Sequence, residues 1–178
     1  MPTNFPTSLD TFTTKVNSVD TIDASHINDL QDAMEQVETI LGASSARRTA
    51  WTPTITFETT APTSITYTTA NTGGWYARFG SLIYVVGRVE IATISGGSGS
   101  AVVSLPVTAY SGNFTLASLA VSTAANYTTL YPSVLRVNAA STTARLYGYM
   151  STAGFTALTN SNVTGSSTLF FSGFYFHA

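Results

Sequence analysis

Few side chains in this sequence could carry acid–base chemistry. After residue 48 the chain has no aspartate, lysine or cysteine, its carboxylates are Glu58 and Glu90, and its one histidine is His177. Hydrolysis by paired carboxylates needs both acids at one cleft, and no nucleophile-elbow motif supports a Ser-His-acid site. One histidine and two scattered glutamates also make a poor metal-ligand set. We therefore expect no catalytic residue, no metal site and no cofactor, and hence no enzyme.

Aromatic side chains are the remaining groups suited to recognition, with 10 Phe, 9 Tyr and 2 Trp. Most of them are expected in the core, because a β domain of this size needs large apolar side chains. Rings in turn-like sequence contexts are candidates for exposed platforms. Such rings can stack on the C–H faces of neutral sugars, while neighbouring hydroxyls and amides pair with sugar hydroxyls. The candidates for glycan contact are Trp75, Tyr110, Tyr127 and Tyr131.

The composition excludes two classes of partner. Charged residues make up 9% of the 178 residues, against roughly 25% in an average soluble domain. The basic residues form no patch that could neutralise several phosphates, so we expect no nucleic-acid binding. The longest apolar stretches are short and carry charges, so we expect no membrane insertion. With 44% hydrophobic residues, the chain suits one globular domain plus a small extra element.

The charge is distributed unevenly along the chain. Residues 1 to 42 hold seven of the nine acidic residues and one basic residue, whereas residues 49 to 178 hold two acidic residues and four arginines. The sequence GASSARR at 42 to 48 joins a helix-stopping glycine to a run of small residues. We therefore expect a linker at residues 43–50, between a helical segment and a separate C-terminal domain.

Residues 23–42 are expected to form a short coiled-coil helix. Its apolar residues recur at alternating spacings of three and four, which matches the a and d positions of a heptad repeat; they are Ile27, Leu30, Met34, Val37 and Leu41. A helix of this length is marginal alone in water. The seam therefore needs a partner, and its mixture of residue types does not distinguish two strands from three.

Residues 1–22 are expected to form an extended arm. Prolines oppose helix formation there, threonine and serine are dense, and apolar residues occur without a nearby core. Two interpretations stay open, a disordered tail or a peptide that becomes ordered in a groove of a larger particle. The residues that would fill such a groove are Phe5, Pro6, Leu9 and Phe12.

Residues 51–178 predict a mainly β domain. Short runs rich in β-branched and aromatic residues are separated by Gly, Pro, Asn and Ser. Eight or nine such strands at short spacing indicate an antiparallel β-sandwich with a jelly-roll-like arrangement. The expected strands are 52–58, 63–69, 74–80, 81–92, 100–105, 113–121, 133–139, 144–150 and 167–176.

Four stretches resemble bacteriophage fibre proteins. They are TIDASHINDLQDAMEQVE at 21–38, TAWTPTITF at 49–57, GGWYARFGSLIYVVGRVEI at 73–91 and FFSGFYFH at 170–177. The first is similar to the helix that follows a short arm in tail-fibre and head-fibre proteins. The others resemble parts of the β modules of such fibres, with Arg78 and Gly80 at the family's positions.

The resemblance implies a homotrimer with a virion-anchoring arm, a three-helix stem and an outward β knob. Its short stem favours a capsid fibre or decoration protein, or a small tail appendage, at the virion surface. The arm would then bind a capsid or tail structural protein. The alternative is a receptor-binding protein that recognises host cell-surface polysaccharide during adsorption.

Overall fold

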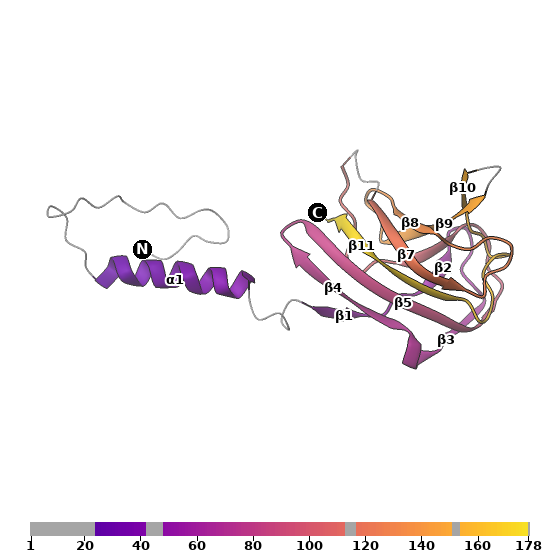
Figure 1. Ribbon diagram of the computed structural model, residues 1–178, viewed down its shortest axis with the longest axis horizontal. Helices are drawn as coiled ribbons and strands as arrows, with labels where there is room; N and C mark the ends of the chain where they lie inside the picture. Colours follow the sequence, from indigo (N-terminus) through magenta and orange to yellow (C-terminus); the bar gives the residue numbers. More distant parts are fainter. Residues whose placement is uncertain (1–23, 42–47, 113–116, 151–153, 178) are drawn as a thin grey trace. The chain divides into compact units, whose positions relative to one another are not determined.

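The computed structural model describes residues 24–41, 48–112, 117–150 and 154–177 (Figure 1). The chain divides into two compact units, residues 1–47 and residues 48–178. Within the described residues, no helix has the length and apolar character needed to cross a bilayer. Each unit is described by itself.

The N-terminal unit contains the helix α1, Ala24–Leu41. Its bounds lie within the predicted segment 23–42, and it ends one residue before Gly42. The described side chains of the heptad seam are exposed: Ile27 at 53%, Leu30 at 54%, Met34 at 58% and Val37 at 38%. An apolar stripe of this kind normally lies against another surface. The described seam residues of the helix therefore form an exposed apolar stripe.

The C-terminal unit is an antiparallel sheet of eleven strands, ordered β1-β4-β5-β11-β7-β8-β9-β6-β2, with β10 beside β9 and β3 beside β5. A short 3-10 turn, η1 (Thr69–Asn71), separates β3 from β4. The strands are β1 (Thr49–Trp51), β2 (Ile55–Phe57), β3 (Ser64–Tyr67), β4 (Gly73–Phe79), β5 (Leu82–Ser95), β6 (Ala101–Ser104), β7 (Ala117–Ala125), β8 (Val134–Val137), β9 (Thr143–Met150), β10 (Gly154–Ala157) and β11 (Thr168–Phe176).

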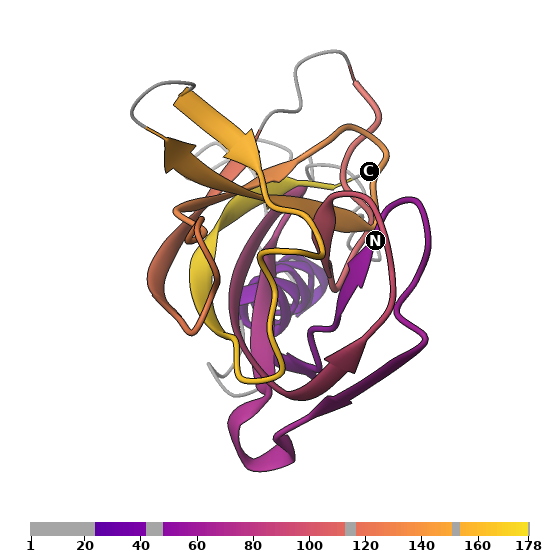
Figure 2. The same ribbon diagram turned by 90° about the vertical axis from the view of Figure 1, so that its right-hand side faces the viewer.

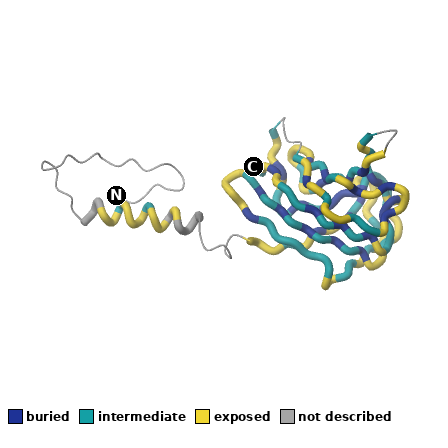
Figure 3. The backbone as a smooth tube through the Cα atoms, viewed as in Figure 1, coloured by how far each residue is buried: buried dark blue, intermediate teal, exposed yellow. Residues whose placement is uncertain are grey.

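The expected mainly β, antiparallel class is confirmed, whereas the jelly-roll arrangement is not. The described strands form one continuous sheet that curls around a single core (Figure 2). Alternation of buried and less buried residues along the central strands places one face inward (Figure 3). Strand β1 begins at Thr49, so the last two residues of the predicted linker 43–50 belong to the sheet.

The curled sheet is closed by a side chain of β3. The amide of Ile55 in β2 donates to the Tyr67 hydroxyl at 2.9 Å, and this hydroxyl donates to the Ile55 carbonyl at 3.0 Å. Strand β2 is the last strand of the sheet order, so these backbone groups have no further strand to pair with. Unpaired backbone groups in a buried position are costly. The tyrosine therefore satisfies both outward backbone groups of Ile55 at this edge.

A second tyrosine makes the same kind of bond from β11. The Tyr175 hydroxyl donates to the Val107 carbonyl at 2.9 Å and accepts from the Val107 amide at 3.3 Å. Tyr175 is 1% exposed. Burial raises its pKa to about 12, so the hydroxyl remains a donor at neutral pH. This contact ties the segment after β6 to the centre of the sheet.

Two glycines in strand interiors belong to one row of paired residues that crosses four strands of the sheet. Trp51 pairs with Gly74, Gly74 with Gly87, and Gly87 with Phe171. A Cβ at Gly87 would collide with the Phe171 ring, and one at Gly74 would collide with the β5 backbone. The Trp51 and Phe171 rings meet edge to face, with centroids 6.3 Å apart. The glycines leave the inner surface free for these two rings.

We predict that Tyr175→Phe lowers the free energy of unfolding by about 1–3 kcal/mol, because both backbone groups of Val107 lose their partner in a partly buried position. Urea denaturation of the purified protein measures this. Tyr84→Phe is the matched control, since no hydrogen bond of the Tyr84 hydroxyl occurs in the described structure, and it should change stability little. Equal effects of the two variants would contradict the role assigned to Tyr175.

Candidate functional site

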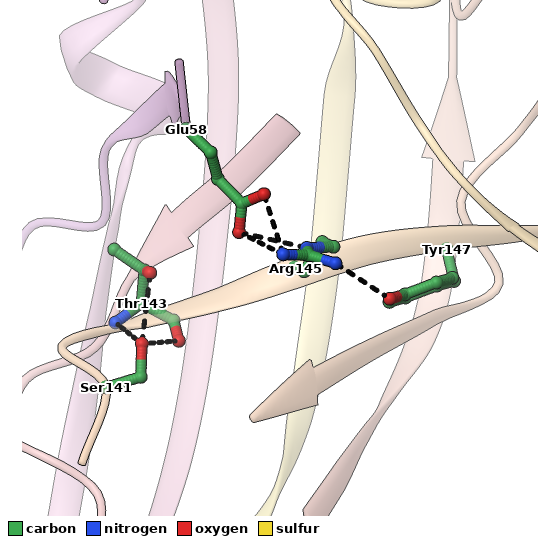
Figure 4. Close-up of polar contacts among 5 residues, drawn as sticks. All are labelled: Glu58, Ser141, Thr143, Arg145 and Tyr147. Carbon is green, nitrogen blue, oxygen red and sulfur yellow. Dashed lines mark hydrogen bonds and ion pairs between the residues drawn. The ribbon is translucent and has the colours of Figure 1, made fainter. Parts of the chain in front are cut away.

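The best-defined polar contact on the outer face of the sheet joins Arg145 of β9 to Glu58. Arg145 donates to Glu58 Oε1 from Nε at 2.9 Å and from Nη2 at 2.8 Å, and Nη2 lies 2.7 Å from Oε2 (Figure 4). Its Nη1 donates to the Tyr147 hydroxyl at 3.3 Å. The hydrogen bond to Glu58 raises the pKa of Arg145. All three nitrogen atoms of the Arg145 guanidinium thus have hydrogen-bond partners within the protein.

Arg136 of β8 lies directly opposite Arg145 in the register of the sheet. Like charges in directly opposite positions repel each other. The Arg136 guanidinium lies over the Tyr147 ring at 4.6 Å and over the Phe155 ring at 5.2 Å. Stacking on aromatic faces stabilises a cation. Within the described part of the chain no carboxylate pairs with Arg136.

The aromatic surface continues past the arginines onto β10. Phe155 pairs with Tyr149 across β9 and β10, and their rings meet edge to face at 5.7 Å. Tyr149 is 64% exposed and Phe155 is 48% exposed. We call these six residues the arginine–aromatic cluster: Glu58, Arg136, Arg145, Tyr147, Tyr149 and Phe155.

The turn between β8 and β9 sets the register that brings the two arginines together. Ala140 has φ of 53°, a left-handed conformation that few non-glycine residues adopt, and its amide donates to the Tyr110 carbonyl at 3.0 Å. Ser141 Oγ then accepts from the Thr143 amide at 3.1 Å and donates to the Thr143 carbonyl at 2.8 Å (Figure 4). These bonds fix the start of β9 and so the position of Arg145.

A comparable arginine lies on β5. Arg88 stacks over Phe170 at 4.6 Å, and its Nη2 donates to Glu90 Oε2 at 3.0 Å. Here the stacked cation has its carboxylate within the same strand. The two glutamates of the β unit therefore each bind a different arginine, on strands that are not neighbours in the sheet. They do not form a carboxylate pair at one site.

His177 contacts backbone carbonyls rather than either of the two carboxylates. Its Nε2 is 3.0 Å from the Gly80 carbonyl, and its amide donates to the Ser81 carbonyl at 2.8 Å. Among the described residues, no group of three or more His, Asp or Glu side chains could hold a metal ion. The titratable residues that the sequence singled out thus have separate backbone or arginine partners.

Three of the four predicted glycan-contact residues reach the surface but do not form one platform. Trp75 is half-buried in β4; the Arg48 guanidinium carbon lies 5.4 Å from its ring centroid, and the Tyr84 ring centroid also lies 5.4 Å away. Tyr110 is 48% exposed and Tyr131 is 52% exposed. No ring contact joins Trp75, Tyr110 and Tyr131 to one another within the described residues.

The expectation that Tyr127 is an exposed platform is wrong, because its side chain is only 4% exposed. Its ring joins the core cluster and meets Tyr131 at 6.2 Å. Burial raises the pKa of Tyr127. The loop that carries it folds inward because Asn162 donates from Nδ2 to the Thr128 carbonyl at 3.0 Å.

The proposed anchor residues Phe5, Pro6, Leu9 and Phe12 lie outside the described residues, as does the side chain of Leu41. The sequence did carry a signal for the arginine–aromatic cluster. Arg145, Tyr147 and Tyr149 alternate along one strand and therefore share its outer face. Arg136 and Phe155 could not be placed beside them, since that requires the register of three strands.

No family model matches this sequence, and no curated protein matches it either. Among solved structures, the crystal structure of Dettilon tailspike protein (gp208) is similar in fold, with a TM-score of 0.57 and 17% sequence identity. The match covers 72% of this chain and 23% of that one, so the chain spans about a quarter of the tailspike's length. This likeness shows the fold.

We predict that Tyr127→Phe leaves the free energy of unfolding unchanged or raises it by up to about 1 kcal/mol. The buried Tyr127 hydroxyl has no hydrogen-bond partner among the described residues, so its removal relieves a desolvation cost. Urea denaturation beside Tyr175→Phe measures the contrast. A loss comparable to that of Tyr175→Phe would show that the hydroxyl has a partner.

Proposed function

We propose that this protein is a structural component of a bacteriophage virion, a short trimeric fibre or decoration appendage attached to capsid or tail by its N-terminal arm. The observation that carries the proposal is the exposed heptad seam of α1 in a chain whose β unit has a tailspike-like fold. Three copies of the seam would bury one another. The β unit would then face away from the particle.

The composition of the β unit supports an outward position. Its surface carries few charges and many hydroxyls, and its sheet edge at β2 is capped by Tyr67. Capped edges limit strand-to-strand association between particles. We propose the virion surface as the location of the chain for the same reasons.

A second candidate function is receptor binding through host cell-surface glycans. The observation that favours it is the arginine–aromatic cluster, which combines exposed rings with charged hydrogen-bonding groups. Glu58 and Glu90 each bind a different arginine, so we propose that the β unit binds without hydrolysing its ligand.

The oligomeric state tests the stem. We predict that Leu30→Ser combined with Met34→Ser weakens the trimer by at least tenfold in association, because two apolar positions per chain leave the seam. Light scattering over a concentration series measures this. Asp32→Ser combined with Glu35→Ser is the matched control on the outer face of the helix. A monomer for the wild-type protein would overturn the fibre interpretation.

Virion association tests the arm. We predict that removal of residues 1–22 abolishes binding to particles purified without this protein, while circular dichroism shows the β unit still folded. Full-length protein added to the same particles should co-sediment with them. Equal co-sedimentation of the shortened protein would place the attachment elsewhere in the chain.

A further inference from the structure

We propose that the arginine–aromatic cluster binds a carboxylated sugar, with the carboxylate on Arg136 and the sugar ring against Tyr149 and Phe155. This inference rests on the glycan-binding function proposed above and names its ligand class. It differs from the neutral sugars that the sequence led us to expect. The argument comes from the charges, the stacking geometry and the exposed ring faces of the cluster.

The cluster holds two guanidinium groups and one carboxylate. Arg136 and Arg145 are directly opposite, and Glu58 contacts Arg145 through both of its carboxylate oxygens. One positive charge is therefore left without a counter-ion inside the described structure. Arg136 is thus the arginine of this cluster that has no carboxylate partner among the described residues, and two aromatic rings lie beside it. A carboxylate beside Arg136 would complete two ion pairs on adjacent strands.

The Arg136 side chain makes no hydrogen bond within the described residues, so its donors are available to a ligand. A guanidinium carries its five N–H donors in its own plane, so a ring that lies against one of its faces leaves those donors free. Tyr147 and Phe155 are the rings that lie over its central carbon. They also limit the freedom of the side chain before any ligand arrives. A planar, restrained donor fork suits the two oxygens of a carboxylate.

The neighbouring rings provide the apolar part of the site. Tyr149 is 64% exposed and lies edge to face with Phe155, the ring that also lies 5.2 Å from the Arg136 guanidinium carbon. Exposed aromatic rings grouped with polar side chains are typical of recognition surfaces. The C–H face of a pyranose can lie on such a ring while an acidic substituent reaches the arginine.

The chain contains an internal comparison for this assignment. Arg88 stacks on Phe170 at the same 4.6 Å distance at which Arg136 stacks on Tyr147. Arg88, however, already pairs with Glu90 at 3.0 Å. Stacking alone is therefore not what distinguishes the proposed site. The difference is the absence of a carboxylate partner at Arg136.

The experiment measures binding of the full-length protein to acidic oligosaccharides by calorimetry. The probes are oligogalacturonate, oligomannuronate, a hyaluronan oligosaccharide and a sialylated oligosaccharide, and each is compared with its methyl ester. The variants are Arg136→Met and the matched control Arg88→Met. Tyr149→Ala is added because its exposed position should not affect folding.

We expect at least one acidic probe to bind, and its methyl ester to bind at least tenfold more weakly. Arg136→Met should weaken binding at least tenfold and Tyr149→Ala several-fold, whereas Arg88→Met should leave it unchanged. Salt should weaken binding, as for any charge-dependent contact. No binding by any acidic probe, equal binding of acid and ester, or equal loss in both arginine variants would overturn the proposal.

An oligosaccharide that has sulfate esters but no carboxylate, used in the same assay, separates carboxylate recognition from general anion binding. It should bind at least tenfold more weakly than the best carboxylated probe, and equal affinity would overturn the assignment to a carboxylate. The oligomeric state and particle binding of Arg136→Met are measured in parallel. If the oligomeric state and particle binding stay intact while neither the wild-type protein nor any variant binds a glycan, the ligand proposal fails and the proposed virion function stands.

Discussion

The hydrogen bonds of two tyrosine hydroxyls hold the curled sheet in its shape. A sheet of eleven strands with a single apolar face must bend until that face is covered, and its last strand then has backbone groups without a partner. Tyr67 satisfies those of Ile55 in β2, and Tyr175 satisfies those of Val107 after β6. Each hydroxyl both donates to and accepts from one residue, so a single side chain satisfies both backbone groups of that residue. The outer face, which carries the arginine–aromatic cluster, follows the curvature that these contacts fix.

Much of the fold was predictable because its signals are local. Alternating apolar residues placed the long strands β5, β9 and β11 close to their observed bounds, and the heptad placed α1. The short strand β1 was missed because the chain from Gly42 to Thr49 reads as a linker of small residues. Strand β10 was missed because four residues without alternation carry no periodic signal.

The candidate site was less predictable, because its members meet only through register. Tyr127 follows an asparagine in a turn-like stretch, which indicated exposure, but hydrogen bonds between distant loops carry its ring into the core. Arg136 and Arg145 are nine positions apart in sequence, and their pairing depends on the left-handed Ala140 in the intervening turn. Local patterns identify which face of a strand a side chain occupies. They do not identify its neighbour on the next strand.

The row that begins at Trp51 also decides how the β unit would respond to mechanical load. A pull transmitted along the chain from its N-terminal side enters the sheet at Thr49, the first residue of β1. This strand pairs with β4 over three residues, so its hydrogen bonds alone would offer little resistance. The Trp51 ring, however, lies in the space left by two glycines and against Phe171. Detaching β1 means pulling this partly buried ring away from the core, so the resistance of β1 to load comes mainly from one aromatic side chain.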